Sequence, residues 1–400
     1  MAAMKRLAIF FDGTWNSPER GRSRASVRGH TALFKPTNVL KLYRALRPRG
    51  EDEAPQVALY LEGVGAFIGE RSRAGRLQAA TDRLLGGIFG GGFEARVKAA
   101  CRFLVGNHEP GDSIHVVGFS RGAAQAASLV RFLAWAGGLL RKRDEYFLPE
   151  LFERFRATRA RPGAAAEALA AIRSRGGNDE SVLDPLPVEI AFLGLFDPVL
   201  ALGSRLRADR LEGEVATVEK GLDFHAGREL PGNVRVARVA LAIDESRWDF
   251  RPVVWKPPAE LPDRLELRWF PGVHSNVGGG YSQDGLANFA LYWMASEARA
   301  AGLDFDRDLL ANFRPNPKGD RPDERRGWMR LSEWMRGKSG RGIRRIEAIG
   351  GEIDDSVWRL LLEEEGYRPA NLLQWIRDRP EALAGLADET RRRVAEIARA

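Results

Sequence analysis

The chain has 400 residues, of which 44% are hydrophobic, so it carries enough apolar material to build a folded core. Its 62 lysine and arginine residues exceed its 54 acidic residues, but the positive charge is spread along the chain, which indicates a solvated surface rather than a nucleic-acid-binding patch. The single cysteine, Cys101, excludes an internal disulfide framework and lies in an apolar helical stretch, where we expect a core residue.

The first residues, Met1–Arg6, lead directly into a strand-like segment and lack the apolar stretch and small-residue cleavage site of a signal peptide. No apolar run reaches the roughly 18 residues that a membrane span needs. We therefore expect a cytoplasmic protein, and export by a signal-independent machine is compatible with this sequence.

Six short β-rich segments alternate with helical stretches, which predicts an α/β fold with a mostly parallel sheet. Several of them are nearly continuous apolar runs, as expected for strands covered by helices on both faces. The six segments are Leu7–Phe11, Val57–Leu61, Ser113–Gly118, Val188–Phe196, Val234–Ile243 and Leu265–Phe270.

The first strand candidate ends in the loop Asp12-Gly13-Thr14. A phosphotransfer enzyme with such a loop needs a nucleophilic aspartate two residues before Asp12, where this chain has Phe10, so we reject that interpretation. An ordinary Asx turn is one alternative. The other is half of an oxyanion hole, in which the N–H of Gly13 or Thr14 contacts the substrate and Asp12 holds the loop by pairing with Arg121.

The third strand candidate runs into Gly118-Phe119-Ser120-Arg121-Gly122, followed by several alanines. This is the pattern G-x-S-x-G between a strand and a helix, which is typical of a nucleophile elbow. The strained turn requires tiny residues two positions before and after Ser120, and Gly118 and Gly122 meet that requirement. The N–H of Arg121, at the start of the helix, would contact an oxyanion. The alternative is a serine that only caps the helix.

A nucleophilic serine needs a histidine base, and the chain has five histidines. His274 follows the strand Leu265–Phe270 in a glycine-rich loop, where a base is expected. His30 and His108 precede the serine, His115 lies within its strand, and His225 in a polar loop is the weaker candidate.

The base in turn needs a carboxylate to orient it. Asp197 directly follows an apolar strand, at the sheet edge where the sites of open α/β folds lie. A turn or helix-capping role for Asp197 is the alternative, and Asp244 and Glu245 are competing candidates for the acid. No metal-binding pattern such as H-E-x-x-H is present, so we expect chemistry without a metal or cofactor.

Three segments look like insertions: Gly63–Gly92, Arg141–Pro187 and Arg314–Arg345. Behind them, Val357–Glu365 and Leu372–Arg377 have helical periodicity. We expect one catalytic domain, residues 1–313, with a helical cap formed by insertions at about 63–92 and 141–187. An arginine-rich linker and a helical region, residues 314–400, would pack on it.

Together these segments resemble the α/β-hydrolase family of unknown function that includes the catalytic domains of type VI secretion phospholipase effectors. The resemblance spans most of the chain and implies that Ser120, Asp197 and His274 form the catalytic triad of a lipid or ester hydrolase. The segments that carry it are Phe11–Asn16, Thr37–Val39, Gly63–Gly65, Gly111–Asp112, Gly118–Ala123, Phe196–Val199, Ala240–Glu245, Trp269–Tyr281 and Tyr367–Leu372.

Two positions depart from the family pattern. Asn276 stands where the family usually has aspartate, so that one carboxylate near the site becomes neutral, and Asp354 stands where a histidine is common. Neither change touches the triad, and both leave the substrate open.

The sequence thus predicts a serine hydrolase that cleaves carboxylic esters, with a phospholipid or another acyl lipid as substrate. Contact with a membrane surface would follow from such a substrate, and arginines at the rims of the insertions are candidates to receive anionic headgroups. The alternatives are a catalytically silent binding module on the same scaffold, and an acyltransferase that uses the same acyl-enzyme.

Overall fold

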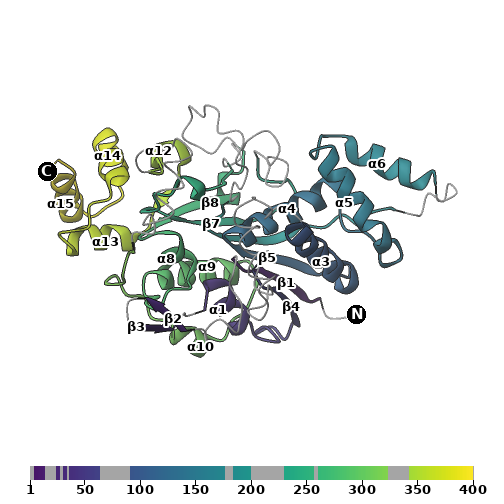
Figure 1. Cartoon of the computed structure of the whole chain (residues 1–400), viewed down its shortest axis with the longest axis horizontal. Coiled ribbons are helices and arrows are strands. Elements are labelled where there is room, and N and C mark those ends of the chain that lie inside the picture. The colour runs from purple at the N-terminus through teal and green to yellow at the C-terminus, as the bar shows by residue number, and fades with distance from the viewer. Residues whose placement is uncertain are drawn as a thin grey trace.

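The computed structural model describes residues 4–13, 24–27, 30–33, 36–63, 91–175, 183–199, 229–255, 260–322 and 342–399. Seven strands form one sheet in the order β4-β1-β5-β6-β7-β8-β9, and every neighbouring pair is parallel (Figure 1). They are β1 (Arg6–Phe11), β4 (Gln56–Leu61), β5 (Ser113–Phe119), β6 (Ile190–Phe196), β7 (Ala237–Ala242), β8 (Leu265–Phe270) and β9 (Glu352–Ile353). A separate antiparallel pair is formed by β2 (Arg24–Val27) and β3 (His30–Leu33).

The predicted α/β fold with its parallel sheet is confirmed, and all six predicted strands are present within a few residues of their expected bounds. The edge strand β9 and the β2–β3 pair were not predicted. β9 has two residues, too few to leave a periodic signal in the sequence.

The two faces of the sheet carry separate cores. On β1, Leu7, Ile9 and Phe11 belong to one buried cluster, while Ala8 and Phe10 belong to the other, because successive side chains of a strand point to opposite faces. All five are buried, which explains why β1 is a continuous apolar run.

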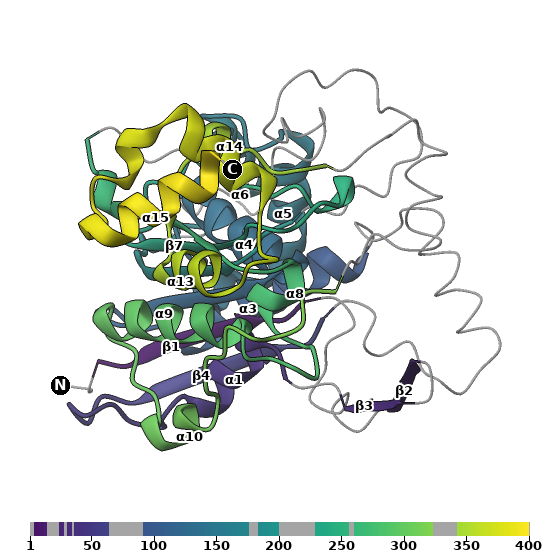
Figure 2. The ribbon, with the colours of Figure 1, turned by 90° about the vertical axis from the view of Figure 1, so that its left-hand side faces the viewer.

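Helices cover both faces. The first cluster contains α3 (Gly91–Asn107) and α4 (Arg121–Ala136), and the second contains α1 (Asn38–Ala45), α9 (Ala287–Ala300) and the short α10 (Arg307–Ala311). Figure 1 shows α9 and α3 on opposite sides of β5, and Figure 2 views the molecule from the side that α9 covers. Cys101 is a core residue of α3, as expected, and burial raises the pKa of its thiol to about 12.

The insertion after α4 forms helices α5 (Leu148–Ala157) and α6 (Ala164–Arg173), which lie at one end of the molecule (Figure 1). Phe155 of α5 packs on Phe132 and Trp135, with ring centroids 5.4 Å apart in both pairs. These two residues lie in the second half of α4, whereas Ser120 precedes its first turn. The described part of this insertion therefore thickens the helical layer beside α4.

Arginines of this insertion have protein partners. Arg161 pairs with Glu167 at 2.9 Å, and Arg175 pairs with Glu150. Their proposed contact with headgroups stays a prediction. The other predicted cap insertion, Gly63–Gly92, lies almost entirely outside the described residues.

The C-terminal region packs on the sheet. Helices α13 (Asp355–Glu363), α14 (Ala370–Asp378) and α15 (Asp388–Arg399) lie at the opposite end of the molecule from α6 (Figure 1), and α13 contacts β8. Val357 and Val394 are fully buried in the same cluster as α3 and α4. The division of the chain at residue 313 stays a prediction. Among the described helices, none is long and apolar enough to cross a bilayer.

One close approach fixes α4 against the sheet. A Cβ atom on Gly122 would lie 2.3 Å from the carbonyl oxygen of Phe11 and 2.6 Å from that of Asp12. Backbone oxygens cannot give way as a flexible side chain does, so the first turn of α4 requires glycine here.

We therefore predict that Gly122→Ala lowers the free energy of unfolding by about 2 kcal/mol or more, because the added methyl group overlaps the end of β1. Urea denaturation followed by circular dichroism would measure it. Gly106→Ala is the matched control, since nothing lies within 4 Å of its added methyl group. That exposed helical position should gain roughly 0.5–1 kcal/mol, and equal effects at both positions would contradict the prediction.

Candidate active site

Ser120 sits in a strained turn between β5 and α4. Its backbone has φ 59° and ψ −125°, a region that residues other than glycine rarely adopt. A Cβ atom on Gly118 would lie 2.7 Å from Cα of Ala123, so both glycines of G-x-S-x-G are required by contact. The side chain of Ser120 makes no capping bond to α4, which contradicts the alternative that this serine only caps the helix.

Three side chains that are distant in sequence form one hydrogen-bonded chain. Ser120 Oγ lies 2.8 Å from His274 Nε2, and His274 Nδ1 lies 2.6 Å from Asp197 Oδ2. All three are buried, with 7%, 5% and 0% of Ser120, His274 and Asp197 exposed. The structure thus brings together the three residues that the sequence singled out for nucleophile, base and acid.

The charge of Asp197 determines which nitrogen of the imidazole carries the proton. Burial by itself would raise the pKa of Asp197, but the adjacent Arg344 guanidinium and the hydrogen bond from His274 hold it well below its usual range. An ionised carboxylate only accepts hydrogen bonds. His274 therefore donates from Nδ1, which leaves Nε2 free to accept the proton of the Ser120 hydroxyl.

Arg344 is a part of the site that the sequence did not reveal. Its Nη1 and Nη2 donate to the two carboxylate oxygens of Asp197 at 2.6 and 3.0 Å. In the sequence Arg344 stands within a run that contains several arginines, and no spacing or neighbour distinguishes it. A long-range ion pair of this kind leaves no local signal.

The two competing acids hold the backbone of the histidine loop. Glu245 Oε2 accepts the backbone N–H of His274 at 3.2 Å and also pairs with Arg247 at 2.7 Å. Asp244 accepts the N–H of Gly272 at 2.6 Å, and its burial raises its pKa to about 6. Of the three candidate carboxylates, Asp197 is thus the one that is hydrogen-bonded to the imidazole ring.

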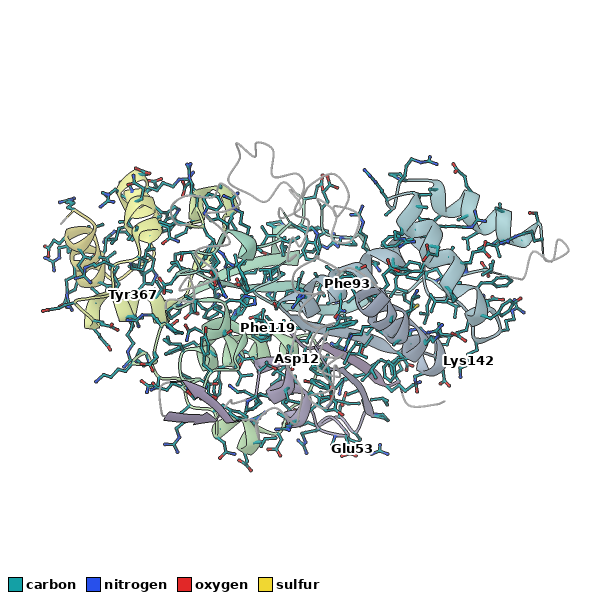
Figure 3. The ribbon with its side chains drawn as sticks, in the orientation of Figure 1. Asp12, Glu53, Phe93, Phe119, Lys142 and Tyr367 are labelled. Atoms are coloured by element: carbon teal, nitrogen blue, oxygen red, sulfur yellow. The ribbon has the colours of Figure 1, made fainter. Side chains whose placement is uncertain are left out.

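Two aromatic rings flank the imidazole. Phe119, next to the serine, and Phe250 both have ring centroids 4.8 Å from that of His274. Figure 3 shows Phe119 near the centre of the molecule. Apolar walls of this kind keep water away from the imidazole and restrict its rotation.

The other histidines contribute nothing to this site in the described structure. His115 is buried within β5 beside Ser113, and burial lowers its pKa to about 3, so it stays neutral. His108 lies after the end of α3. The side chain of His30 and the whole of His225 lie outside the described residues.

The Asp12 loop differs from the prediction in two respects. The Asp12 carboxylate accepts hydrogen bonds from Tyr60 at 2.5 Å and Thr37 at 2.7 Å, and Arg121 is not among its partners in the described structure. Burial raises the pKa of Asp12 to about 6. At this buried position the carboxyl group has two neutral hydroxyl groups as donors in place of the charged arginine that we expected. The N–H of Gly13 donates to Asp12 Oδ1 at 2.6 Å, so in this conformation it is not directed to an oxyanion. Thr14 lies outside the described residues.

No group of three or more histidine, cysteine, aspartate or glutamate side chains in the described part of the chain could hold a metal ion.

A family model describes the chain. Residues 5–297 match the catalytic domain of the Tle1-like phospholipase effectors of type VI secretion systems. The chain belongs to this family. The recognition made from the sequence motifs is thereby confirmed.

The individual proteins that resemble this chain share only a low sequence identity with it. An uncharacterized protein of Saccharomyces cerevisiae is 26% identical over 248 residues, which cover 58% of this chain and 32% of that protein. A crystal structure of an uncharacterized protein from Pseudomonas aeruginosa is 18% identical, with a TM-score of 0.42, and the match covers 99% of this chain and 59% of that one. The structure of the Tle1 effector bound to the VgrG spike is 20% identical, with a TM-score of 0.33, covering 70% of this chain and 51% of that one. The chain thus spans about a third of the curated relative.

Family residues outside the triad connect the site to its surroundings. Thr37 caps α1 and donates to Asp12. Asn38 donates to the carbonyl of Val277 at 2.9 Å and to that of Ala287 at 2.7 Å. Asn38 therefore ties α1 to the short helix α8 (His274–Gly278), which begins with His274.

The first departure from the family pattern has a structural reason. Asn276 Oδ1 accepts the N–H of Val273 at 3.1 Å, and Asn276 Nδ2 donates to the carbonyl of Asp320 at 3.0 Å. A carboxylate could make the first bond but not the second. Asn276 thus holds the histidine loop with both atoms of its amide group. An amide is needed here because the same side chain has to accept one hydrogen bond and donate another.

The second departure, Asp354, caps α13. It accepts a hydrogen bond from the N–H of Ser356 at 2.9 Å. Aspartate is among the strongest capping residues, so this position supports the C-terminal helices.

We predict that Asn276→Asp lowers the free energy of unfolding by about 1–3 kcal/mol, because it sets a buried charge against the Asp320 carbonyl. Thermal or urea denaturation would measure the loss. Asn312→Asp is the control, since Asn312 also donates to backbone carbonyls but is exposed, and it should stay within about 0.5 kcal/mol of the wild type. A loss no larger than that of the control would show that the Asp320 contact does not hold the loop.

Proposed function

We propose that this protein is a serine hydrolase that cleaves the carboxylic ester of a phospholipid or another acyl lipid. The single observation that supports it most is the hydrogen-bonded chain from Ser120 through His274 to Asp197, buried at the strand ends of a domain from a phospholipase effector family.

In this mechanism Ser120 Oγ attacks the ester carbonyl while His274 Nε2 takes the hydroxyl proton. His274 then returns the proton to the leaving alcohol, and an acyl-enzyme on Ser120 remains. A water molecule, deprotonated by the same nitrogen, cleaves that acyl-enzyme and releases the fatty acid. Asp197 stays ionised throughout and stabilises the imidazolium that forms in each half of the reaction.

The negative oxygen of the tetrahedral intermediate needs donors. The N–H of Arg121 stands at the first position of α4, where backbone N–H groups have no partner within the helix and the helix dipole favours negative charge. We assign the first donor of the oxyanion hole to this group. The second donor belongs to the Gly13–Thr14 loop only if the Gly13 N–H turns away from Asp12.

The lipid substrate is supported by the family and not by the geometry of the triad, which serves any ester. The contact with a membrane surface and the cytoplasmic synthesis predicted from the sequence are parts of the same proposal.

We predict that a fluorophosphonate probe labels the wild-type protein at Ser120, and that Ser120→Ala and His274→Ala abolish the labelling. Turnover of a soluble ester should fall roughly 10⁴- to 10⁶-fold in both variants, because nucleophile and base act as one unit. Mass spectrometry of the labelled protein and steady-state kinetics are the measurements.

Ser128→Ala, a buried serine of the same helix α4, is the control and should keep both labelling and turnover. A folded wild-type protein that takes up no label would count against the hydrolase and favour a binding module. Transfer of the acyl group to an added alcohol, in preference to water, would make the enzyme an acyltransferase.

The substrate prediction is separate. Incubated with vesicles of a diacyl phospholipid, the enzyme should release one fatty acid and one lysophospholipid per turnover, both detected by mass spectrometry of the lipid extract. The Ser120→Ala protein is the blank. If the enzyme hydrolyses soluble esters but neither phospholipids nor neutral acyl lipids, the proposal of a serine hydrolase is supported and the proposal of a lipid substrate is refuted.

A further inference from the structure

The segment that follows residue 341 crosses the carboxyl ends of the strands and sends one side chain into the site. Arg344 has 1% of its side chain exposed, and its guanidinium group donates hydrogen bonds to both carboxylate oxygens of Asp197. A paired contact of this kind fixes the plane of the carboxylate as well as its charge.

The carboxylate of Asp197 is fully satisfied as a result. Oδ1 accepts from Arg344 and from the N–H of Ala242, at 2.6 and 3.0 Å. Oδ2 accepts from His274 and from Arg344, at 2.6 and 3.0 Å. Two oxygens thus receive four donors, and two of the four come from Arg344.

Arg344 is itself held in place from several sides. Nη1 also donates to the carbonyl of Ala242 at 3.0 Å, and Nη2 donates to the carbonyl of Phe250. The side-chain amide of Asn371 donates to the carbonyl of Arg344 at 3.0 Å and to that of Ile243 at 2.9 Å. Asn371 therefore ties the Arg344 segment to the end of β7.

We propose that Arg344 is a positioning residue of this active site, which sets the orientation of Asp197 and the readiness of His274 to accept a proton. The inference rests on the proposed function, since it concerns the same triad. It makes the C-terminal segment, which lies beyond the residues matched by the family model, a working part of the catalytic apparatus.

The electrostatic effect has a definite sign. Asp197 stabilises the positively charged imidazolium, and Arg344 already offsets part of its negative charge. Without Arg344, the full charge of Asp197 would act on His274, so the imidazole would take up a proton at a higher pH. A protonated His274 cannot accept the proton of Ser120, and activity would therefore appear only at higher pH.

Other charged groups lie near the imidazole, and one of them also responds to Arg344, because the Arg247 and Arg344 guanidinium groups both help to lower the pKa of Glu245. On the loop after β7, Glu245 is paired with Arg247, and Asp244 bonds to the N–H of Gly272. Arg121 follows Ser120 at the start of α4. Because burial raises the pKa of Asp244 to about 6, this carboxylate titrates in the range of the acid limb. The effect of Arg344 is therefore measured as the difference between each variant and the wild type, in which Asp244 is the same.

The test compares three variants with the wild type: Arg344→Met removes charge and donors, Arg344→Gln removes charge but keeps a donor, and Arg344→Lys keeps charge but loses the paired geometry. The measurement is kcat/KM for a soluble ester as a function of pH, whose acid limb reports the base of the free enzyme. Arg238→Met is the matched control, because Arg238 on β7 pairs with Glu297 at 2.5 Å and with Glu266 at 3.5 Å away from the triad.

We expect the acid limb to move upward by about one pH unit in Arg344→Met and Arg344→Gln, as the loss of a neighbouring opposite charge implies. At pH values below the acid limb, a shift of one pH unit lowers kcat/KM roughly tenfold relative to the wild type. At higher pH the two neutral variants should recover this loss. Arg344→Lys should keep the wild-type limb with a lower kcat, and Arg238→Met should keep both.

A uniform loss at every pH, with the limb unmoved in both neutral variants, would reduce Arg344 to a structural residue and overturn the proposal. The same conclusion follows if both neutral variants fail to fold while Arg238→Met folds, because Arg344 would then be needed for the fold itself.

A second measurement separates this inference from the proposed hydrolase function. With only five histidines in the chain, ¹³C labelling of histidine gives a short spectrum in which the resonance missing from His274→Ala identifies His274. Its titration midpoint should move upward in Arg344→Met whether or not the protein turns over an ester. A moved midpoint in a protein that takes up no fluorophosphonate would sustain the role of Arg344 and refute the hydrolase, whereas active enzyme with an unmoved midpoint would do the reverse.

Discussion

The neutralisation of one fully buried carboxylate organises this end of the molecule. Asp197 has no contact with solvent, and an ionised carboxylate without water needs positive charge and donors around it. It receives them from the end of β7, from the helix that carries His274 and from Arg344. In the proposed mechanism, burial and function use the same contacts, because the donors that stabilise the buried charge of Asp197 also fix the carboxylate that orients His274.

The parallel sheet makes such a meeting possible. Ser120, Asp197 and His274 follow β5, β6 and β8, and the carboxyl ends of parallel strands lie along one edge. Residues up to 154 positions apart in the chain thereby come within hydrogen-bond distance. The strain at Ser120 and the absence of side chains at Gly118 and Gly122 complete the arrangement, since they allow α4 to begin directly against the strands.

Much of this could be predicted from the sequence because it depends on local patterns. Continuous apolar runs marked the buried strands, and the small residues around Ser120 marked the turn. The position of His274 after a strand marked the edge where the base lies. The choice among Asp197, Asp244 and Glu245 was harder, because all three follow strands and only the direction of each side chain separates them.

What escaped prediction depends on pairing at long range or on burial. The side-chain partners of Asp12 are the hydroxyl groups of Tyr60 and Thr37. We expected Arg121 instead, because the sequence suggests pairs of opposite charge but not which hydroxyl groups are buried together. Arg344 could not be told from its neighbouring arginines, and β9 was too short to detect. The reason Asn276 is an amide became visible only with the carbonyl of Asp320 beside it.

The contact between Arg344 and Asp197 also bears on what should be regarded as one unit of this protein. The match to the family model ends at residue 297, and a fragment cut there would retain Ser120, Asp197, His274 and every strand of the sheet except β9. Such a fragment would nevertheless lack the Arg344 guanidinium, which neutralises the carboxylate of Asp197 in the whole chain. The smallest piece of this chain that preserves the charges around Asp197 is therefore longer than the piece that the family model matches.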